Sequence, residues 1–260
     1  MTALTQGVAA TPATSSAGIP FLRLLNVEFR KLFDTRAARV LLAVMIAGAV
    51  GLQLVVLFTD DSSPMRLSTF FEIGIQPIGM LLPVVAIMST TAEWSQRTNL
   101  ITFMWEPRRG HVLTAKFVAG LIVAILGILA VMASAVVCLG LGSVLGNTVS
   151  FELDGSVLLG VVVMMLVSVA QGIAFGALIH NTAGALVAFF VLPMVVSTVF
   201  MMVNALRDVY PWVDLNSASS PIMSGIFESG EVARFATSVA IWVVLPGIIG
   251  VWRTINREAK

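Results

Sequence analysis

The sequence predicts an all-α integral membrane protein with six transmembrane helices, and three of its features lead to this fold class. Only 11% of the 260 residues are charged and 58% are hydrophobic, whereas a soluble domain carries about 25% charged residues. The mean hydropathy is +0.97. The hydrophobic residues are collected in long runs. A water-soluble globule could not cover its surface with so few charges, which excludes soluble, disordered and nucleic-acid-binding proteins.

Six stretches are long and apolar enough to cross a membrane as helices, because a hydrocarbon core of roughly 30 Å takes about 20 residues. Proline residues in the second, fifth and sixth stretches are expected to kink those helices. None of the stretches shows the polar and apolar alternation of a membrane β-barrel, so membrane-spanning strands are not expected. The six predicted spans are residues 40–58, 69–91, 112–139, 156–179, 183–203 and 235–252.

The basic residues predict the orientation of the spans. With a cytoplasmic N-terminus, the outer loops hold only Arg66, Arg207 and Arg234. Eleven basic residues in the inner segments against these three in the outer loops predict that both termini are cytoplasmic. Residues 1–18 lack a basic start and an apolar core, so we expect a disordered tail there and not a secretory signal. The eleven basic residues of the inner segments are Arg23, Arg30, Lys31, Arg36, Arg39, Arg97, Arg108, Arg109, Arg253, Arg257 and Lys260.

Residues 19–38 are predicted to form an amphipathic helix that lies along the inner leaflet. On a helical wheel, Arg23, Asn26, Arg30 and Asp34 occupy the polar half. Glu28 falls inside the apolar half, and two interpretations of it stay open: it has a partner, such as a basic residue of the neighbouring cytoplasmic loop, or it snorkels to water. The apolar half consists of Phe21, Leu22, Leu24, Leu25, Phe29, Leu32 and Phe33.

The loop after the second span is predicted to contain a short cytoplasmic helix over residues 92–105. Thr91 is suited to cap its N-terminus, Glu93 would lie in its first turn, and Glu93 and Arg97 are spaced for an ion pair. Residues 106–110 contain proline and glycine, which end the helix. A helix of this kind is suited to contact another protein; the alternative is that it rests among lipid headgroups.

These two segments together resemble the type-2 permeases of ATP-binding-cassette (ABC) transporters, a type V exporter-like bacterial family. The first match is Glu28-Phe29-Arg30-Lys31-Leu32 followed by Arg36. The second is Glu93-Trp94-x-x-x-Thr98, then Pro107-Arg108-Arg109 and Ala115-Lys116, in the order of the family's loop after span two. Arg97 departs from the family, whose members often have glycine there. The resemblance covers residues 26–120.

The resemblance implies a multi-pass exporter subunit of the inner (cytoplasmic) membrane, whose loop after span two is a coupling helix that docks on an ATPase. It implies two copies of that ATPase, which bind ATP and magnesium, and a second permease subunit, identical or homologous. Re-entrant helices before the last span are typical of the family, and the apolar residues 221–227 are compatible with one. The implied coupling residues are Glu28, Glu93, Trp94, Arg97, Thr98, Pro107, Arg108, Arg109 and Lys116.

No enzymatic activity, bound cofactor or metal site is expected of this chain. It has no G-x-x-x-x-G-K-[ST] phosphate loop, so ATP hydrolysis requires a separate protein. Neither His111 nor His180 belongs to an H-E-x-x-H motif, and no G-x-S-x-G motif occurs, so a membrane hydrolase lacks a catalytic constellation. His180 is expected to end a helix. A single cysteine, Cys138, excludes an internal disulfide and a multi-thiolate metal site.

A few polar residues lie within the spans. Glu72 is near the outer end of span two, either as an outer-mouth residue or as the proton or cation site of a secondary transporter. Lys116 is expected among the headgroups or near the ATPase. Gln53 and Gln171 either pack helices together or line a substrate pathway. Gly172-x-x-x-Gly176 would allow close helix packing within the subunit or between subunits.

The function expected from the sequence is that of an exporter permease. Because the predicted walls are generic apolar side chains, the substrate is expected to be hydrophobic or amphipathic: a drug, a lipid or a peptide. Two alternatives remain, an ion- or proton-coupled secondary transporter that uses Glu72 and a membrane anchor or sensor subunit without transport activity.

Overall fold

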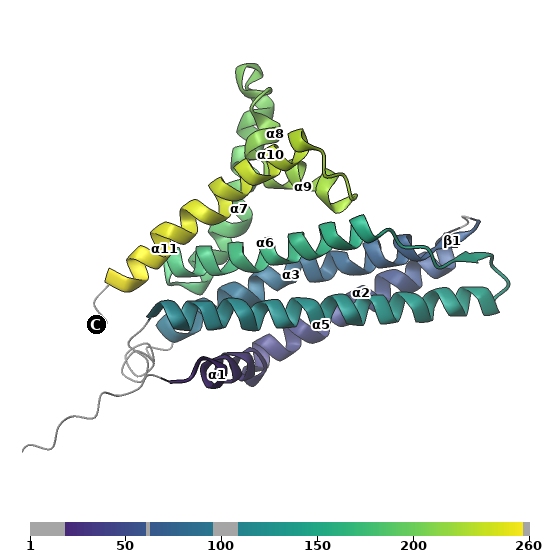
Figure 1. The fold of residues 1–260 in the computed structure, drawn as a ribbon, viewed down its shortest axis with the longest axis horizontal. Helices are drawn as coiled ribbons and strands as arrows, with labels where there is room; N and C mark the ends of the chain where they lie inside the picture. The colour runs from purple at the N-terminus through teal and green to yellow at the C-terminus, as the bar shows by residue number, and fades with distance from the viewer. Residues whose placement is uncertain (1–18, 61–62, 96–108, 257–260) are drawn as a thin grey trace, which may run out of the picture.

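The computed structural model describes residues 19–60, 63–95 and 109–256, and within these ranges the chain is almost entirely helical (Figure 1). Six of its helices are long and apolar enough to cross a membrane. The predicted class of all-α membrane protein is therefore confirmed, while the predicted tail of residues 1–18 lies outside the described residues. The spans are α2 (Arg36–Thr59), α3 (Leu67–Ser95), α5 (Arg109–Val144), α6 (Gly155–Ile179), α7 (Thr182–Met202) and a last run of α10 (Ser229–Val239), η2 (Ala240–Val244) and α11 (Leu245–Asn256).

Four of these helices form a bundle with α3 at its centre. α3 contributes Phe71, Ile75 and Ile78 to the main core, and α2, α5 and α6 supply most of the rest of it, Ala124 and Val131 of α5 among them. In Figure 1, α7 and α10 extend away from the four-helix bundle toward α8 (Tyr210–Val213), whereas α11 packs against α6. α7 is accordingly the most accessible span, with Ala185 as its one buried residue.

The helices continue through their internal prolines. α3 contains Pro77 and Pro83, and α7 contains Pro193. Pro246 lacks an N–H group and would clash with the carbonyl group four residues earlier in a regular α-helix. The π-helical turn η2, which ends two residues before Pro246, widens the helix at this point and so accommodates the proline ring.

Polar side chains begin and end the helices at the positions where the chain turns. α1 (Phe21–Asp34) is separated from α2 by Thr35, whose hydroxyl accepts the Ala38 N–H at 3.1 Å. Asp154 caps α6 by accepting the Ser156 N–H at 2.9 Å, and this hydrogen bond lowers the pKa of Asp154. Such caps satisfy N–H groups that have no partner within the helix.

The end of the bundle opposite α1 is closed by short elements, and apart from the re-entrant segment expected around residues 221–227 sequence analysis did not predict them. β1 (Met65–Arg66) and β2 (Val149–Ser150) pair in parallel and join the α2–α3 loop to the α5–α6 loop. After η1 (Asn204–Leu206) and α8, helix α9 (Leu215–Met223) packs on α6, where a Cβ atom on Gly160 would lie 1.9 Å from the Ile222 oxygen. The segment between the last two spans therefore folds back against the bundle.

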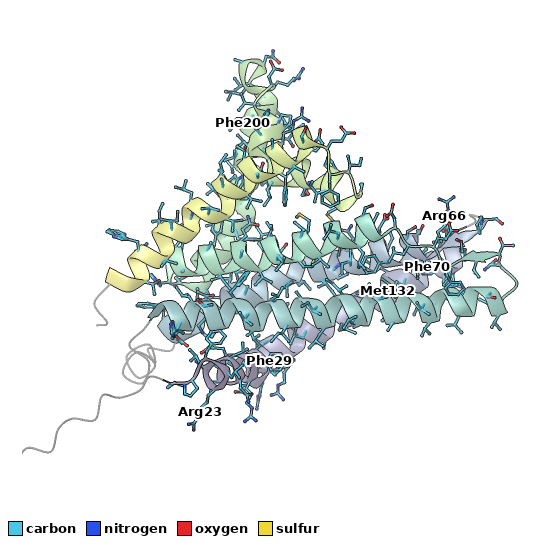
Figure 2. All side chains as sticks on the ribbon, viewed as in Figure 1. Arg23, Phe29, Arg66, Phe70, Met132 and Phe200 are labelled. Carbon is cyan, nitrogen blue, oxygen red and sulfur yellow. The ribbon has the colours of Figure 1, made fainter. Side chains whose placement is uncertain are left out.

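Both ends of the described chain lie at one end of the bundle, as six crossings require. α1 contacts the start of α5 through Leu24, and Thr254 of α11 contacts His180 at the end of α6. Figure 2 shows Arg23 of α1 and Arg66 of β1 at opposite ends of the molecule. We call the end that carries α1 the α1 end; it is the end that the basic residues predict to be cytoplasmic.

Candidate functional site

Four charged side chains form a closed ring at the α1 end. Lys31 Nζ donates to Glu28 Oε1 at 2.6 Å and to Glu93 Oε1 at 2.8 Å. Lys116 Nζ donates to Glu28 Oε2 at 2.6 Å and to Glu93 Oε1 at 3.1 Å. Each lysine contacts both carboxylates, so this ion-pair ring has no net charge. Its members come from α1, α3 and α5, and the ring therefore joins three helices.

Three of the four side chains in the ion-pair ring are buried. The exposed fraction is 1% for Glu28, 3% for Lys116 and 8% for Glu93, against 38% for Lys31. Lys116 also donates to the main-chain oxygen of Ser89 at 3.1 Å, so all three of its N–H donors are used. Buried charges are tolerated when they are paired and hydrogen-bonded, and this arrangement meets both conditions.

Lys31 is the accessible member of the ring. Burial lowers the pKa of Lys31, but the negative charges of Glu93 and Glu28, together with their hydrogen bonds, raise it by more. The pKa of Lys31 therefore lies above the ordinary value of 10.5, because its partners favour the charged form. Lys31 is a stable cation at neutral pH. The sequence motif contained Lys31, yet sequence analysis did not include it among the coupling residues.

The apolar half of α1 is divided between two environments. Leu24, Glu28 and Leu32 recur every four residues and are all buried against the bundle. Leu22 and Phe33 remain exposed and are free to contact lipid. Glu28 lies on the packed part, so the interpretation in which it has a partner is confirmed and the one in which it snorkels to water is wrong. Its partners among the described residues are a lysine of α1 itself and a lysine of α5.

The prediction that a separate helix begins after Thr91 is wrong. α3 continues to Ser95, because residues 88–95 contain no glycine or proline that would end it. The Thr91 hydroxyl donates to a carbonyl oxygen of the preceding turn at 2.9 Å instead of capping a new helix. Glu93 is therefore in the last turn of α3, not in a first turn. Residues 96–105, the rest of the predicted helix, lie outside the described residues.

A second junction beside the ring joins α3 to α6, α7 and α11. The rings of Trp94 and His180 lie 4.1 Å apart. His180 ends α6 with a φ of 56°, as expected of a helix-terminating residue, and its Nε2 shares a 3.0 Å hydrogen bond with Thr254 Oγ1. Thr91 Oγ1 and Thr182 Oγ1 share another, at 2.7 Å. These contacts hold the end of α3 in place from the side opposite α1.

The remaining predicted coupling residues lie in or next to the segment between α3 and α5. Arg97, Thr98, Pro107 and Arg108 are outside the described residues, and Arg109 is the first residue of α5. α3 ends at Ser95, two residues after Glu93, and α5 begins at Arg109, about 10 Å of helix before Lys116.

A cavity of about 610 Å³ opens beside the ion-pair ring. α1, α2, α3 and α7 supply its walls, and the ring contributes Lys31, Glu93 and Lys116. The other wall residues include the apolar Val85 and Met88 and also polar ones, among them Asp34. Cavities of about 300–1,000 Å³ with mostly apolar walls and a few polar groups are typical of small-molecule sites.

The two amides within the spans are buried. Gln53 Nε2 donates to the Phe70 and Val131 oxygens at 3.2 Å each and so joins α2, α3 and α5. Its Oε1 has no hydrogen-bond partner among the described residues. Gln171 is buried on α6. The contacts of Gln53 support the packing interpretation, and neither amide is among the described residues that line the 610 Å³ cavity.

The paired glycines of α6 allow it to approach α3 closely. A Cβ atom on Gly172 would lie 2.6 Å from the Pro83 oxygen, and one on Gly176 would lie 2.8 Å from Thr90 Cβ. Both distances are too short for any larger residue in this arrangement. Of the two predicted roles for this motif, the structure supports packing within the subunit.

Glu72 lies at the end opposite α1. It is exposed and lines a recess of about 340 Å³ together with Arg66, Glu152 and Asp154. This position fits a residue of the outer mouth better than a proton relay through the bundle. No group of three or more His, Cys, Asp or Glu side chains that could hold a metal ion occurs among the residues searched, those that the structure describes.

Comparison with known proteins adds no relative to this description. No protein-family model matches the chain, and no curated protein matches it. The functional argument therefore rests on the sequence motifs and on the geometry of the ion-pair ring, which brings the two motif-bearing segments into contact.

Proposed function

We propose that this chain is the permease subunit of an ABC exporter and that a separate ATPase docks on the segment between α3 and α5. The observation that carries the proposal is the ion-pair ring. Glu28 and Lys31 belong to the first segment that resembles the permease family, and Glu93 and Lys116 belong to the second. The ring brings these segments into direct contact. Two segments that resemble the same family separately are thus joined in one structure, which neither motif alone would indicate.

The ring suggests how force reaches the transmembrane helices. In the proposed mechanism, two ATPase subunits close on ATP and magnesium and press on residues 96–108. α3 and α5, which flank this segment, then move together with α1, because the ring contacts are short, charged and largely buried. α1 passes into α2 after one extended residue, Thr35, so α2 is displaced as well. α2 and α3 are walls of the cavity, whose access changes from one side of the membrane to the other.

The exposed apolar helix α7 supports the proposal of a second permease subunit, identical or homologous. Only Ala185 of this helix is buried in the single chain, and its mean hydropathy is 2.4. Lipid or another subunit must cover such a surface. The proposed complex lies in the inner membrane with both termini in the cytoplasm. The chain itself supplies the pathway and no enzymatic step.

The experiment that tests the proposal is copurification of the full-length chain from its own membrane in mild detergent. A stand-alone ATPase should copurify with it, and Arg108→Glu should reduce the recovered ATPase at least tenfold, because it reverses a charge in the docking segment. Arg66→Glu, the same reversal at the opposite end, should leave recovery unchanged. Substrate transport that needs an ion gradient and Glu72 but no ATPase would establish a secondary transporter instead.

A further inference from the structure

We infer that the 610 Å³ cavity beside the ion-pair ring binds an amphipathic monovalent cation and that Asp34 receives its positive group. The inference rests on the proposed function, for which it names the class of substrate. The cavity lies at the α1 end, where α1 meets α2 and where α3 and α7 come together. It is therefore placed to receive a molecule that arrives from the cytoplasmic leaflet.

The charge of the cavity wall favours a cation. Lys31, Glu93 and Lys116 line it, but all three are engaged in the ring, which Glu28 makes neutral. Asp34 is the other charged residue of the described lining; it is exposed and forms no ion pair within the ranges that the structure describes. The four charged residues of the described lining sum to zero; with Glu28, which contacts both lysines but is not part of that lining, the ring and Asp34 together carry a net charge of −1.

The apolar surface of the cavity favours a ligand with a hydrophobic body. Leu32, Val85 and Met88 provide large apolar contacts, and small alanines leave room between them. The charge lies at one side of this surface, at the last residue of α1. An amphipathic cation would contact the apolar wall with its body and Asp34 with its charged group. An anion of the same shape would meet the Asp34 carboxylate, and Lys116 has no donor left to offer it. Lys31 uses two of its three donors in the ring, and its charge is balanced there by Glu28 and Glu93.

Two probes of nearly the same shape and opposite charge test this inference. Tetraphenylphosphonium and tetraphenylborate are each measured by equilibrium dialysis against the full-length chain in nanodiscs, and binding to empty nanodiscs is subtracted. Tetraphenylphosphonium should bind the chain saturably, and tetraphenylborate should show no saturable binding. Asp34→Asn should weaken the cation affinity about fivefold, the usual upper limit for one partly exposed charge contact. Glu72→Gln, which neutralises an exposed carboxylate at the opposite end, should leave the affinity unchanged.

A cavity-filling variant gives an independent check. Ala92 lines the cavity and is half-buried, so Ala92→Trp should abolish saturable binding while the helical circular dichroism of the chain is retained. Equal binding of the two probes, or wild-type affinity in Asp34→Asn, would overturn the inference. Because the assay contains no ATPase, such a failure leaves the proposed function standing. If the chain binds the cation saturably but recovers no ATPase, the proposed function fails and the cation site stands.

Discussion

Replacing Lys116 with methionine removes the most buried cation of the ion-pair ring. The side chain is 3% exposed and contacts Glu28 at 2.6 Å and Glu93 at 3.1 Å. Methionine has a similar length and keeps the apolar stem of lysine, so the variant changes the charge more than the packing. Two buried carboxylates are then left with Lys31 as their only partner within the ring.

The expected loss of stability follows from burial. Removing one partner of a buried ion pair costs about 3–5 kcal/mol, because the other charge remains buried without compensation. We expect the lower end of that range, about 3 kcal/mol, since Lys31 still contacts both carboxylates. This corresponds to a roughly hundredfold fall in the ratio of folded to unfolded protein.

Two further variants separate the buried charge from other effects. Lys116→Met combined with Glu28→Gln leaves a balanced pair of Lys31 and Glu93, so most of the lost stability should return. Arg234→Met breaks a contact of comparable length, 2.8 Å to Glu231, but those side chains are 40% and 26% exposed. An exposed pair is worth about 0–1 kcal/mol, and this control should be nearly neutral.

The assay is equilibrium unfolding of the purified chain in mixed micelles of increasing denaturing detergent, followed by helical circular dichroism. The refuting result is a Lys116→Met variant that loses no more stability than Arg234→Met. A double variant as unstable as the single one would equally show that an unpaired carboxylate is not the cause.

Three other predictions concern separate parts of the structure. Gly172→Ala should lower the free energy of unfolding by about 1–3 kcal/mol, because a Cβ atom there would lie 2.6 Å from a backbone oxygen of α3. Gly51→Ala is the control: a Cβ atom there would have nothing within 4 Å, so the variant should be neutral or stabilising in the same unfolding assay. Burial and the adjacent Asp214 carboxylate raise the pKa of Tyr210, so Asp214→Asn should lower it; the chain has one tyrosine, and its absorbance titration reports this pKa directly. Because the pKa of Lys31 is raised in the folded state, the contribution of its charge to folding stability is complete below pH 10.5 and is lost as the pH rises through the folded-state pKa. The unfolding midpoint should therefore not vary with Lys31 ionisation near neutral pH.

The spans could be predicted from the sequence because hydrophobic length determines them almost alone. The predicted run of residues 112–139 falls within α5, and the helix extends beyond it at both ends, since charged, polar and glycine residues can continue a helix without appearing in a hydropathy pattern. The continuation of α3 past Thr91 could not be predicted either, because residues after the apolar run also continue that helix. A threonine that is suited to cap a helix also satisfies its hydroxyl inside one, and only the course of α3 decides between the two.

The ion-pair ring was only partly predictable. Glu28 was conspicuous as a carboxylate in an apolar arc, and that pattern correctly indicated a partner. Its main partner, Lys116, lies 88 residues away, and no local pattern connects two residues at that distance. Sequence analysis places Lys31 only among the inner basic residues and in the first motif. It reaches the ring because α1 packs against α5 through Leu24, a tertiary contact that helical periodicity does not specify.

The central claim is that the segment between α3 and α5 receives an ATPase while the ion-pair ring carries its force to the spans. The most direct test replaces residues 96–108 with a glycine-serine linker of equal length and measures ATPase recovery and magnesium-dependent ATP hydrolysis in the purified complex. The account predicts an unchanged unfolding midpoint, because the ring and the contact of Trp94 with His180 remain, and loss of the ATPase. A variant that keeps the ATPase and its activity would contradict the account.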